Sequence, residues 1–289
     1  MNKILQFPIV RIIIAILFVG AATAVGQILL GLLQAAFSIT NPAIANALAF
    51  ILIIPLTYFA YVFYVRLIEK REATELGFSN AWKEFGIGAL IGFGLFCLVI
   101  LVLWLMGYYR VINVKLVSLT VFGSLLGAFV SAWVQELIFR ASIYRITEEW
   151  LGTWWALAIS ALLFGLIHLS SEGATLMSAL AVSLEAGIIL GAAYTLTHRI
   201  WMALGIHMAW DFANDGIFGV GIAGQSGEKL SGLLQANLSG PAWVTGGTLG
   251  VEASIITLIV MLLAGSAVLW IAYRGGHFVF RKKQAPATA

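Results

Sequence analysis

The chain has 289 residues, of which 61% are hydrophobic and only 10% are charged. A soluble domain carries about 25% charged residues, so this composition excludes an ordinary soluble protein. Its apolar runs are continuous and long enough to span a bilayer as helices, which excludes an outer-membrane barrel of alternating strands. The net charge of +3 suits loops at an anionic membrane surface better than nucleic-acid binding. We therefore expect an all-α, polytopic transmembrane helical bundle surrounded by membrane lipids.

Glycine, proline and charged clusters divide the chain into about eight predicted spans. These are 9–37, 44–66, 86–107, 116–147, 153–170, 174–197, 200–218 and 252–274. We group them into four parts. Residues 1–114 form an N-terminal part with three spans and a charged, soluble cytoplasmic loop at 67–84. Residues 115–215 form a core, 216–251 a Gly-rich outer loop, and 252–289 a last span with a basic tail. We expect the outer loop to form an ordered cap that includes a short helix.

Most lysine and arginine residues fall at one end of these spans, and only Arg110, Lys115 and Lys229 fall at the other. Basic loops stay on the cytoplasmic side of a membrane. The pattern predicts an integral multi-pass protein with both chain ends in the cytoplasm, most simply in a prokaryotic plasma membrane. Pairs of glycines four residues apart predict close helix contacts at Gly88/Gly92, Gly123/Gly127 and Gly187/Gly191.

The fourth predicted span contains Gln135, Glu136 and Arg140. Ionisable side chains are costly in a membrane and mark candidate functional sites. Glu136 and Arg140 are four residues apart, the spacing of a helical ion pair. Gln135 projects about 100° away from Glu136, and its amide exchanges hydrogen bonds but cannot take a proton from water. Taken alone, the ion pair has a structural explanation, which is to hold the helix in place.

Two further spans carry polar pairs at the same spacing. Phe164 and His168 lie at the end of the fifth span, where the phenyl ring can wall off the imidazole. His207 and Asp211 lie in the seventh, where the carboxylate can orient the imidazole or share a cavity with it. Each pair alone is equally compatible with a structural role. Glu185, in the sixth span, is compatible with a cavity wall, a partner for Arg140, or a buried protonated acid.

A depth argument brings the three spans together. The turn near Leu151 and Gly152 lies midway between Gln135 and His168, so an antiparallel hairpin places both about 25 Å from that turn. His207 lies only about 12 Å beyond the turn near 198–199. The depths agree if the hairpin tip at 148–152 projects into the cytoplasm. We therefore expect one polar site inside the bundle.

The three motifs are Gln-Glu-x-x-x-Arg, Phe-x-x-x-His and His-x-x-x-Asp, in this order on successive spans. They resemble the CAAX protease and bacteriocin-processing (CPBP) family of intramembrane proteases, also called the ABI family. The family pattern is Glu-Glu-x-x-x-Arg, then Phe-x-x-x-His, then a histidine followed four residues later by Asn or Asp. The resemblance covers roughly residues 115–215. It implies an endopeptidase that cleaves a peptide or a prenylated or otherwise lipid-linked protein tail.

The resemblance also implies roles for individual residues. The first glutamate of the pattern, which is Gln135 here, activates a water together with His168. His207 and Asp211 polarise the scissile carbonyl and stabilise the oxyanion, while Glu136 and Arg140 support the site. The family has been described both as metalloproteases and as glutamic-type proteases. His168 and His207 with a carboxylate could supply zinc ligands, and the sequence leaves the presence of a metal open.

Gln135 is the departure from this pattern, and three explanations stay open. The residue could be an introduced acid-to-amide change, it could be natural in a pseudoprotease that binds without cutting, or Glu136 could take over its role. A catalytically dead pseudoprotease or immunity-type protein that binds a peptide or partner is therefore the alternative function. A proton-coupled transporter is less favoured, because the chain lacks an evident inverted repeat.

Overall fold

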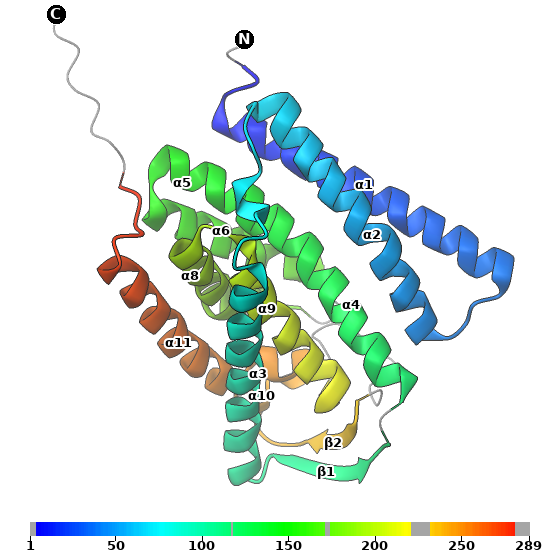
Figure 1. The fold of residues 1–289 in the computed structure, drawn as a ribbon. Helices are drawn as coiled ribbons and strands as arrows, with labels where there is room; N and C mark the ends of the chain where they lie inside the picture. Colours follow the sequence, from blue (N-terminus) through cyan, green and yellow to red (C-terminus); the bar gives the residue numbers. More distant parts are fainter. Residues whose placement is uncertain (1–3, 117, 171–173, 221–231, 281–289) are drawn as a thin grey trace, which may run out of the picture.

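The computed structural model describes residues 4–116, 118–170, 174–220 and 232–280 as a helical bundle (Figure 1). In this part of the chain, seven helices are long and apolar enough to cross a membrane. They are Pro8–Phe37, Pro42–Glu69, Ala81–Leu105, Leu119–Leu151, Thr153–Ser170, Leu176–Thr197 and Ile255–Arg274. The predicted polytopic all-α bundle is confirmed, and the chain is an integral multi-pass membrane protein.

The segment predicted as a span over 200–218 is the exception. It forms helix α9 (Ile200–Phe212), which continues into a π-helical turn, Ala213–Ile217. The polar residues His207, Asp211 and Asn214 lower its mean hydropathy. The segment is therefore not among the helices that are apolar enough to cross a membrane. All residues of α9 from Ile200 to Asp211 are buried, and it lies in the centre of the bundle against α3, α4 and α8. Protein rather than lipid surrounds its polar side chains, which is where such residues are tolerated.

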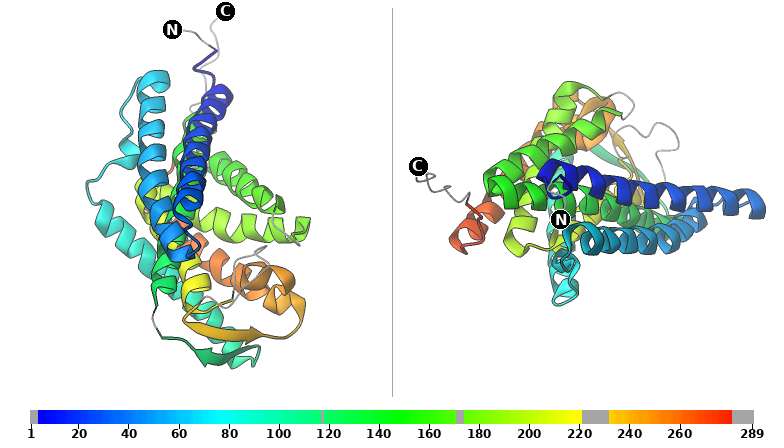
Figure 2. Two further views of the ribbon diagram at one scale, coloured as in Figure 1. Left: turned by 90° about the vertical axis from the view of Figure 1, so that its right-hand side faces the viewer. Right: turned by 90° about the horizontal axis from the view of Figure 1, so that it is seen from above.

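Helices α1 (Pro8–Phe37) and α2 (Pro42–Tyr64) form a hairpin that lies against α4 (Leu119–Glu136). Seen from above in Figure 2, one end of this hairpin extends beyond the rest of the bundle. After α2, a π-helical turn (Val65–Glu69) and a 3₁₀ turn (Thr74–Leu76) lead to α3 (Ala81–Leu105).

Helix α4 continues without a break through a π-helical segment, Leu137–Tyr144, into α5 (Arg145–Leu151). Gly152, with φ of 89°, then reverses the chain at the predicted turn. Helix α6 (Thr153–Ile167) follows and ends in a 3₁₀ turn, His168–Ser170. Next come α7 (Leu176–Val182), a π-helical turn (Ser183–Gly187) and α8 (Ile188–Thr197).

The predicted outer loop is partly ordered. Strands β1 (Tyr109–Val114) and β2 (Leu234–Leu238) pair antiparallel, and the short helix expected in this region is α10 (Ala242–Thr245). A 3₁₀ segment, Gly247–Ala253, leads to α11 (Ile255–Arg274). The strands were not predicted, because each is short and pairs only with a segment far away in the sequence. The middle of the predicted loop, 221–231, lies outside the described residues.

Helices α3 and α9 touch through their backbones. A Cβ atom added at Gly88 would lie 2.2 Å from the carbonyl oxygen of Met202, and one at Gly92 would lie 2.2 Å from that of Ile206. These distances are far below van der Waals contact, so only glycine fits. The other two predicted pairs also face neighbouring helices: Gly123 and Gly127 face α2, and Gly187 and Gly191 face α6. The close helix contacts predicted from the three glycine pairs are therefore confirmed.

A network of ion pairs closes the end of the bundle where α1 begins. Glu69 pairs with Arg11 and Arg145 at 2.8 Å each and with Arg71 at 2.7 Å. Glu75 pairs with Arg71 at 2.7 Å and with Arg145 at 3.4 Å. Both carboxylates are almost fully buried. The loop at 67–84 was predicted to be charged and soluble. The structure shows that these charges are not solvated but buried in ion pairs that tie α1, α2 and α5 together.

Gly92→Ala should destabilise the protein and displace the helix that carries His207. The added methyl collides with the α9 backbone, and overpacking of this kind costs about 1–3 kcal/mol. We expect a lower melting temperature in detergent, measured by loss of monodisperse protein on heating. Gly94→Ala is the matched control, since a Cβ there meets nothing within 4 Å. Equal melting temperatures for the two variants would contradict the assigned contact.

Glu75→Gln should destabilise the ion-pair network. Burial raises the pKa of Glu75, but hydrogen bonds from Arg71 and the charge of Arg145 outweigh it and hold the pKa below its usual 4.5. Removing one partner of a buried pair costs about 3 kcal/mol. A lowered pKa adds stability above the unfolded value that is lost as the pH falls through the folded value. The stability gap between the unmodified protein and the variant should therefore be full near pH 7 and shrink below pH about 4.5. The exposed Glu72→Gln should leave stability unchanged at both pH values.

Candidate active site

Glu136, the last residue of α4, is at the centre of the polar cluster. Its side chain is fully buried. One oxygen, Oε1, accepts hydrogen bonds from Nη1 of Arg140 at 3.2 Å and from Nδ1 of His207 at 2.8 Å. The first contact confirms the predicted ion pair. The second joins α4 to α9, so Glu136 fixes the orientation of the His207 ring.

Arg140 lies in the π-helical segment that follows α4 and is also fully buried. Its Nη2 lies 3.5 Å from the carbonyl oxygen of Gly187, and its guanidinium lies 4.7 Å from the centre of the Phe164 ring. It does not pair with Glu185, one of the open alternatives. Arg140 thus supports Glu136 and Phe164 from behind.

His168 follows the last residue of α6. Its Nδ1 lies 2.8 Å from the carbonyl oxygen of Phe164, one turn earlier. Because a carbonyl oxygen can only accept, Nδ1 carries the proton and Nε2 keeps its lone pair. The Phe164 ring lies 5.2 Å from the imidazole and walls it off, as the spacing predicted. Nε2 of His168 is therefore an acceptor without a partner among the described residues.

His207 and Asp211 lie one turn apart on α9. Nε2 of His207 is 3.6 Å from Oδ2 of Asp211, just beyond hydrogen-bond distance, and both side chains are buried. The Phe164 ring meets the His207 ring edge-on at 5.7 Å. One phenyl group therefore contacts both histidines and Arg140.

Gln135 projects from the face of α4 next to that of Glu136. Its Nε2 donates to Oγ of Ser131 at 3.0 Å. Its Oε1 is buried and accepts no hydrogen bond from the described residues. Gln135 therefore offers one unfilled acceptor.

A small cavity of about 120 Å³ joins these groups. Gln135, His168, His207 and Asp211 line it, whereas Glu136 and Arg140 stand behind its wall. The predicted site residues thus divide into four that face the cavity and two that support them. The other polar residues of the lining are Ser131, Glu185 and Glu252.

Glu185 and Glu252 add two acids to the predicted site. Glu185 lies in the π-helical turn between α7 and α8, and the structure places it in the cavity wall, one of its three predicted options. Glu252 comes from the 3₁₀ segment before α11 and was missed. The signal that could have identified it was an acid directly preceding an apolar span.

A zinc site needs three or more protein ligands around one point. Among the described residues, no group of three or more His, Cys, Asp or Glu side chains is placed to hold a metal. Nδ1 of His207 contacts Glu136 and Nδ1 of His168 contacts a backbone carbonyl, so only Nε2 of each ring is available to a metal. We therefore derive no step through a metal at this site.

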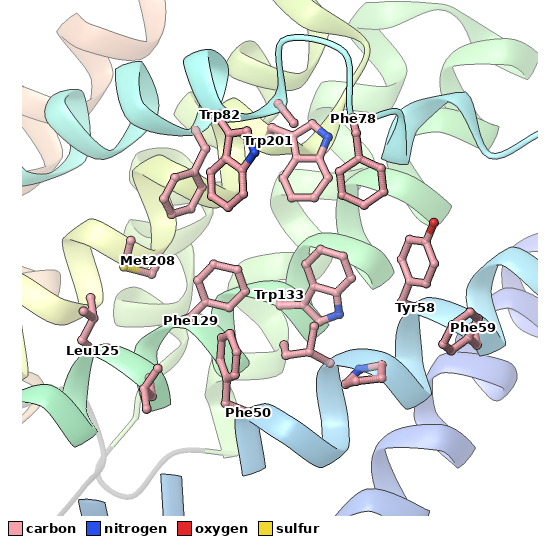
Figure 3. Close-up of a pocket in the computed structure, with 15 residues that line it drawn as sticks. Phe50, Tyr58, Phe59, Phe78, Trp82, Leu125, Phe129, Trp133, Trp201 and Met208 are labelled. Atoms are coloured by element: carbon pink, nitrogen blue, oxygen red, sulfur yellow. The ribbon is translucent and has the colours of Figure 1, made fainter. Parts of the chain in front are cut away.

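A larger cavity of about 560 Å³ lies elsewhere in the bundle, among α2, α3, α4 and α9 (Figure 3). Phe129, Trp133, Trp201 and Met208 face it, and no histidine or carboxylate lines it. Its lining is apolar and largely aromatic. Helices α4 and α9 therefore present polar residues to the small cavity and aromatic residues to the large one.

A third cavity, of about 410 Å³, lies between α4 and the α1–α2 hairpin. It shares Ser131 and Gln135 with the small polar cavity, and Gln27 and Asn46 also line it. The Gln135 side chain therefore borders both cavities.

A comparison with protein-family models matches residues 117–213 to the family described as "Type II CAAX prenyl endopeptidase Rce1-like". No curated protein and no solved structure gives a significant match to the chain. The matched segment begins just before α4, ends just after α9, and contains all six predicted site residues. The match over residues 117–213 agrees with the resemblance to CAAX-type intramembrane proteases that the three motifs carry.

Proposed function

We propose that this protein is an intramembrane endopeptidase that hydrolyses a peptide bond with a water bound in the small cavity. The observation that carries the proposal is that Nε2 of His168 and Oε1 of Gln135, two acceptors without partners among the described residues, belong to side chains lining one cavity. A water that donates to both would keep its oxygen lone pairs for attack on a carbonyl.

His207 and Asp211 complete the reaction geometry. With Nδ1–H donated to Glu136, Nε2 is the ring atom of His207 nearest Asp211. A proton carried by either Nε2 of His207 or Oδ2 of Asp211 is a donor for the oxyanion that forms when water attacks. Such fixed donors are worth about 10²–10³ in rate in other hydrolases. Glu136 and Arg140 act as positioning residues through His207.

The position of the site in the bundle suits a membrane-anchored peptide. Gln135 lies 16 residues from either end of the continuous helix Leu119–Leu151, or about 24 Å along its axis. An extended peptide at that depth needs partners for its backbone N–H and C=O groups. Gln27 and Asn46 in the adjoining cavity carry amides that supply both kinds of partner. We therefore propose a peptide or prenylated protein tail as the substrate.

Gln135→Glu should raise the rate of peptide cleavage. A carboxylate at this position adds a proton acceptor to the bound water, and general-base help is worth about 10²–10⁴-fold. The measurement is cleavage of a fluorogenic peptide ending in a farnesylated CAAX sequence by purified protein in nanodiscs. Gln135→Leu, which removes the water-binding oxygen, is the control and should cleave more slowly than the unmodified protein.

The amide at position 135 also favours a second candidate, a pseudoprotease that binds a peptide without cutting it. The pseudoprotease function is supported if the Gln135→Glu protein leaves the same peptide intact while the unmodified protein binds it. Fluorescence anisotropy of the labelled peptide provides the binding readout.

Asp211→Asn should keep most of the activity that the Gln135→Glu protein shows. The asparagine amide donates a hydrogen bond at the place where Asp211 and His207 hold a proton, so the oxyanion keeps a donor. Asp211→Leu removes the polar group and should lower kcat about 100-fold or more. The comparison uses kcat of both double variants, and equal loss in both would argue against an oxyanion role.

A further inference from the structure

Glu185 is a buried acid in the wall of the small cavity, and the water-binding and oxyanion groups described for the site do not include it. Its side chain is only 3% exposed, and its Oε2 has no hydrogen-bond partner in the described part of the chain. It lines the small cavity together with Gln135 and His168. An unpartnered polar atom in such a place is costly, so its retention calls for a ligand in the cavity.

The local backbone around Glu185 is also unusual. The residue lies in a π-helical turn, Ser183–Gly187, between two α-helical segments. Single π-helical turns within helices occur frequently at functional sites, because the extra residue re-aims a side chain. Gly187 lies in the same turn, and its carbonyl oxygen faces Arg140. The turn that carries Glu185 is therefore part of the framework that supports Glu136.

Glu252 gives Glu185 an acidic neighbour. Both line the cavity and interact electrostatically. Nδ2 of Asn214 lies 3.4 Å from Oε1 of Glu252. Two carboxyl groups in one small cavity can share a single proton, so that one is ionised while the other is protonated.

We propose that Glu185 is the general base of this protein, the carboxylate that accepts the proton of the attacking water in place of the side chain at position 135. The inference rests on the proposed peptidase function. Glu136 also has an Oε2 without a partner among the described residues, but it does not line the cavity, and its Oε1 binds Arg140 and His207. We therefore assign the role to Glu185.

The proposed step balances without any further reactant. The water keeps its hydrogen bond to Nε2 of His168 and turns its second hydrogen from Gln135 to the Glu185 carboxylate. Its oxygen then forms a bond to the carbonyl carbon, the second hydrogen moves to Glu185 as a proton, and the carbonyl π electrons move to the carbonyl oxygen. When the tetrahedral intermediate collapses, the C–N bond breaks and the proton passes from Glu185 to the leaving nitrogen. The products are a carboxylic acid and an amine, and Glu185 is ionised again.

The test compares four proteins in nanodiscs: the unmodified chain, Glu185→Gln, Gln135→Glu, and the double variant. The probe is the fluorogenic farnesylated CAAX peptide. We expect slow cleavage by the unmodified chain and a loss of about 100-fold or more in kcat on Glu185→Gln. In the Gln135→Glu background the same change should cost less than about tenfold, because a second base is present. Activity of the double variant also shows that Glu185→Gln leaves the fold intact.

Two further variants sharpen the result. Glu185→Asp keeps a carboxylate on a shorter side chain and should retain part of the activity that Glu185→Gln loses. Glu84→Gln is the matched control, because Glu84 also has an Oε2 without a partner among the described residues but lies outside the cavity lining. It should leave kcat unchanged.

Three outcomes would overturn the inference. If the unmodified chain is inert while the Gln135→Glu protein cleaves, Glu185 does not supply the base. If Glu185→Gln lowers kcat equally in both backgrounds, or leaves it unchanged in the unmodified chain, its role is structural or absent. If all four proteins are inert toward the peptide, the proposed peptidase function fails for this substrate class and the inference falls with it, so the two failures are distinguishable.

Discussion

The organisation of this bundle depends on a carboxylate that cannot be left unpaired in the interior of a membrane protein. Oε1 of Glu136 is shared between Arg140 on its own helix and His207 on α9, and Arg140 in turn reaches the backbone of the turn before α8. Because a buried charge without partners is strongly unfavourable, these contacts hold three helices in one register. The short, polar α9 is tolerated at the centre of the protein for the same reason.

Because of this constraint, the residues that hold the helices in place differ from the residues that line the cavity. Glu136 and Arg140 lie outside the lining of the small cavity, whereas Gln135 and His168 line it and each keep an acceptor without a partner among the described residues. The backbone contact of α3 with α9 through Gly92 fixes the depth of His207 from the opposite side. The cavity is therefore shaped by residues that do not line it, and its own polar groups remain available for water and peptide.

The parts of this site that helical spacing controls could be predicted from the sequence. The Glu136–Arg140 and Phe164–His168 contacts join residues one turn apart, and the helix repeat alone places them together. The bond from His207 to Glu136 spans 71 residues, and only the depth argument pointed toward it. Glu252 approaches the cavity from beyond a long loop, and no repeat connects it to the motifs. The ion pairs of Glu69 and Glu75 are equally non-local, so charges that looked solvated proved to be buried.

The local structure at position 135 does not require an amide. Nε2 of Gln135 donates to the hydroxyl of Ser131, and a serine hydroxyl can donate as readily as it accepts. A glutamate there would keep the contact with the direction of the hydrogen bond reversed. The amide therefore changes the charge of the cavity rather than its shape. Asp211, Glu185 and Glu252 already line a space of about 120 Å³. A fourth carboxylate would add repulsion among groups that water cannot screen well. Glutamine at this position relieves that repulsion, and in the mechanism we propose the exchange of a proton with bound water falls to Glu185.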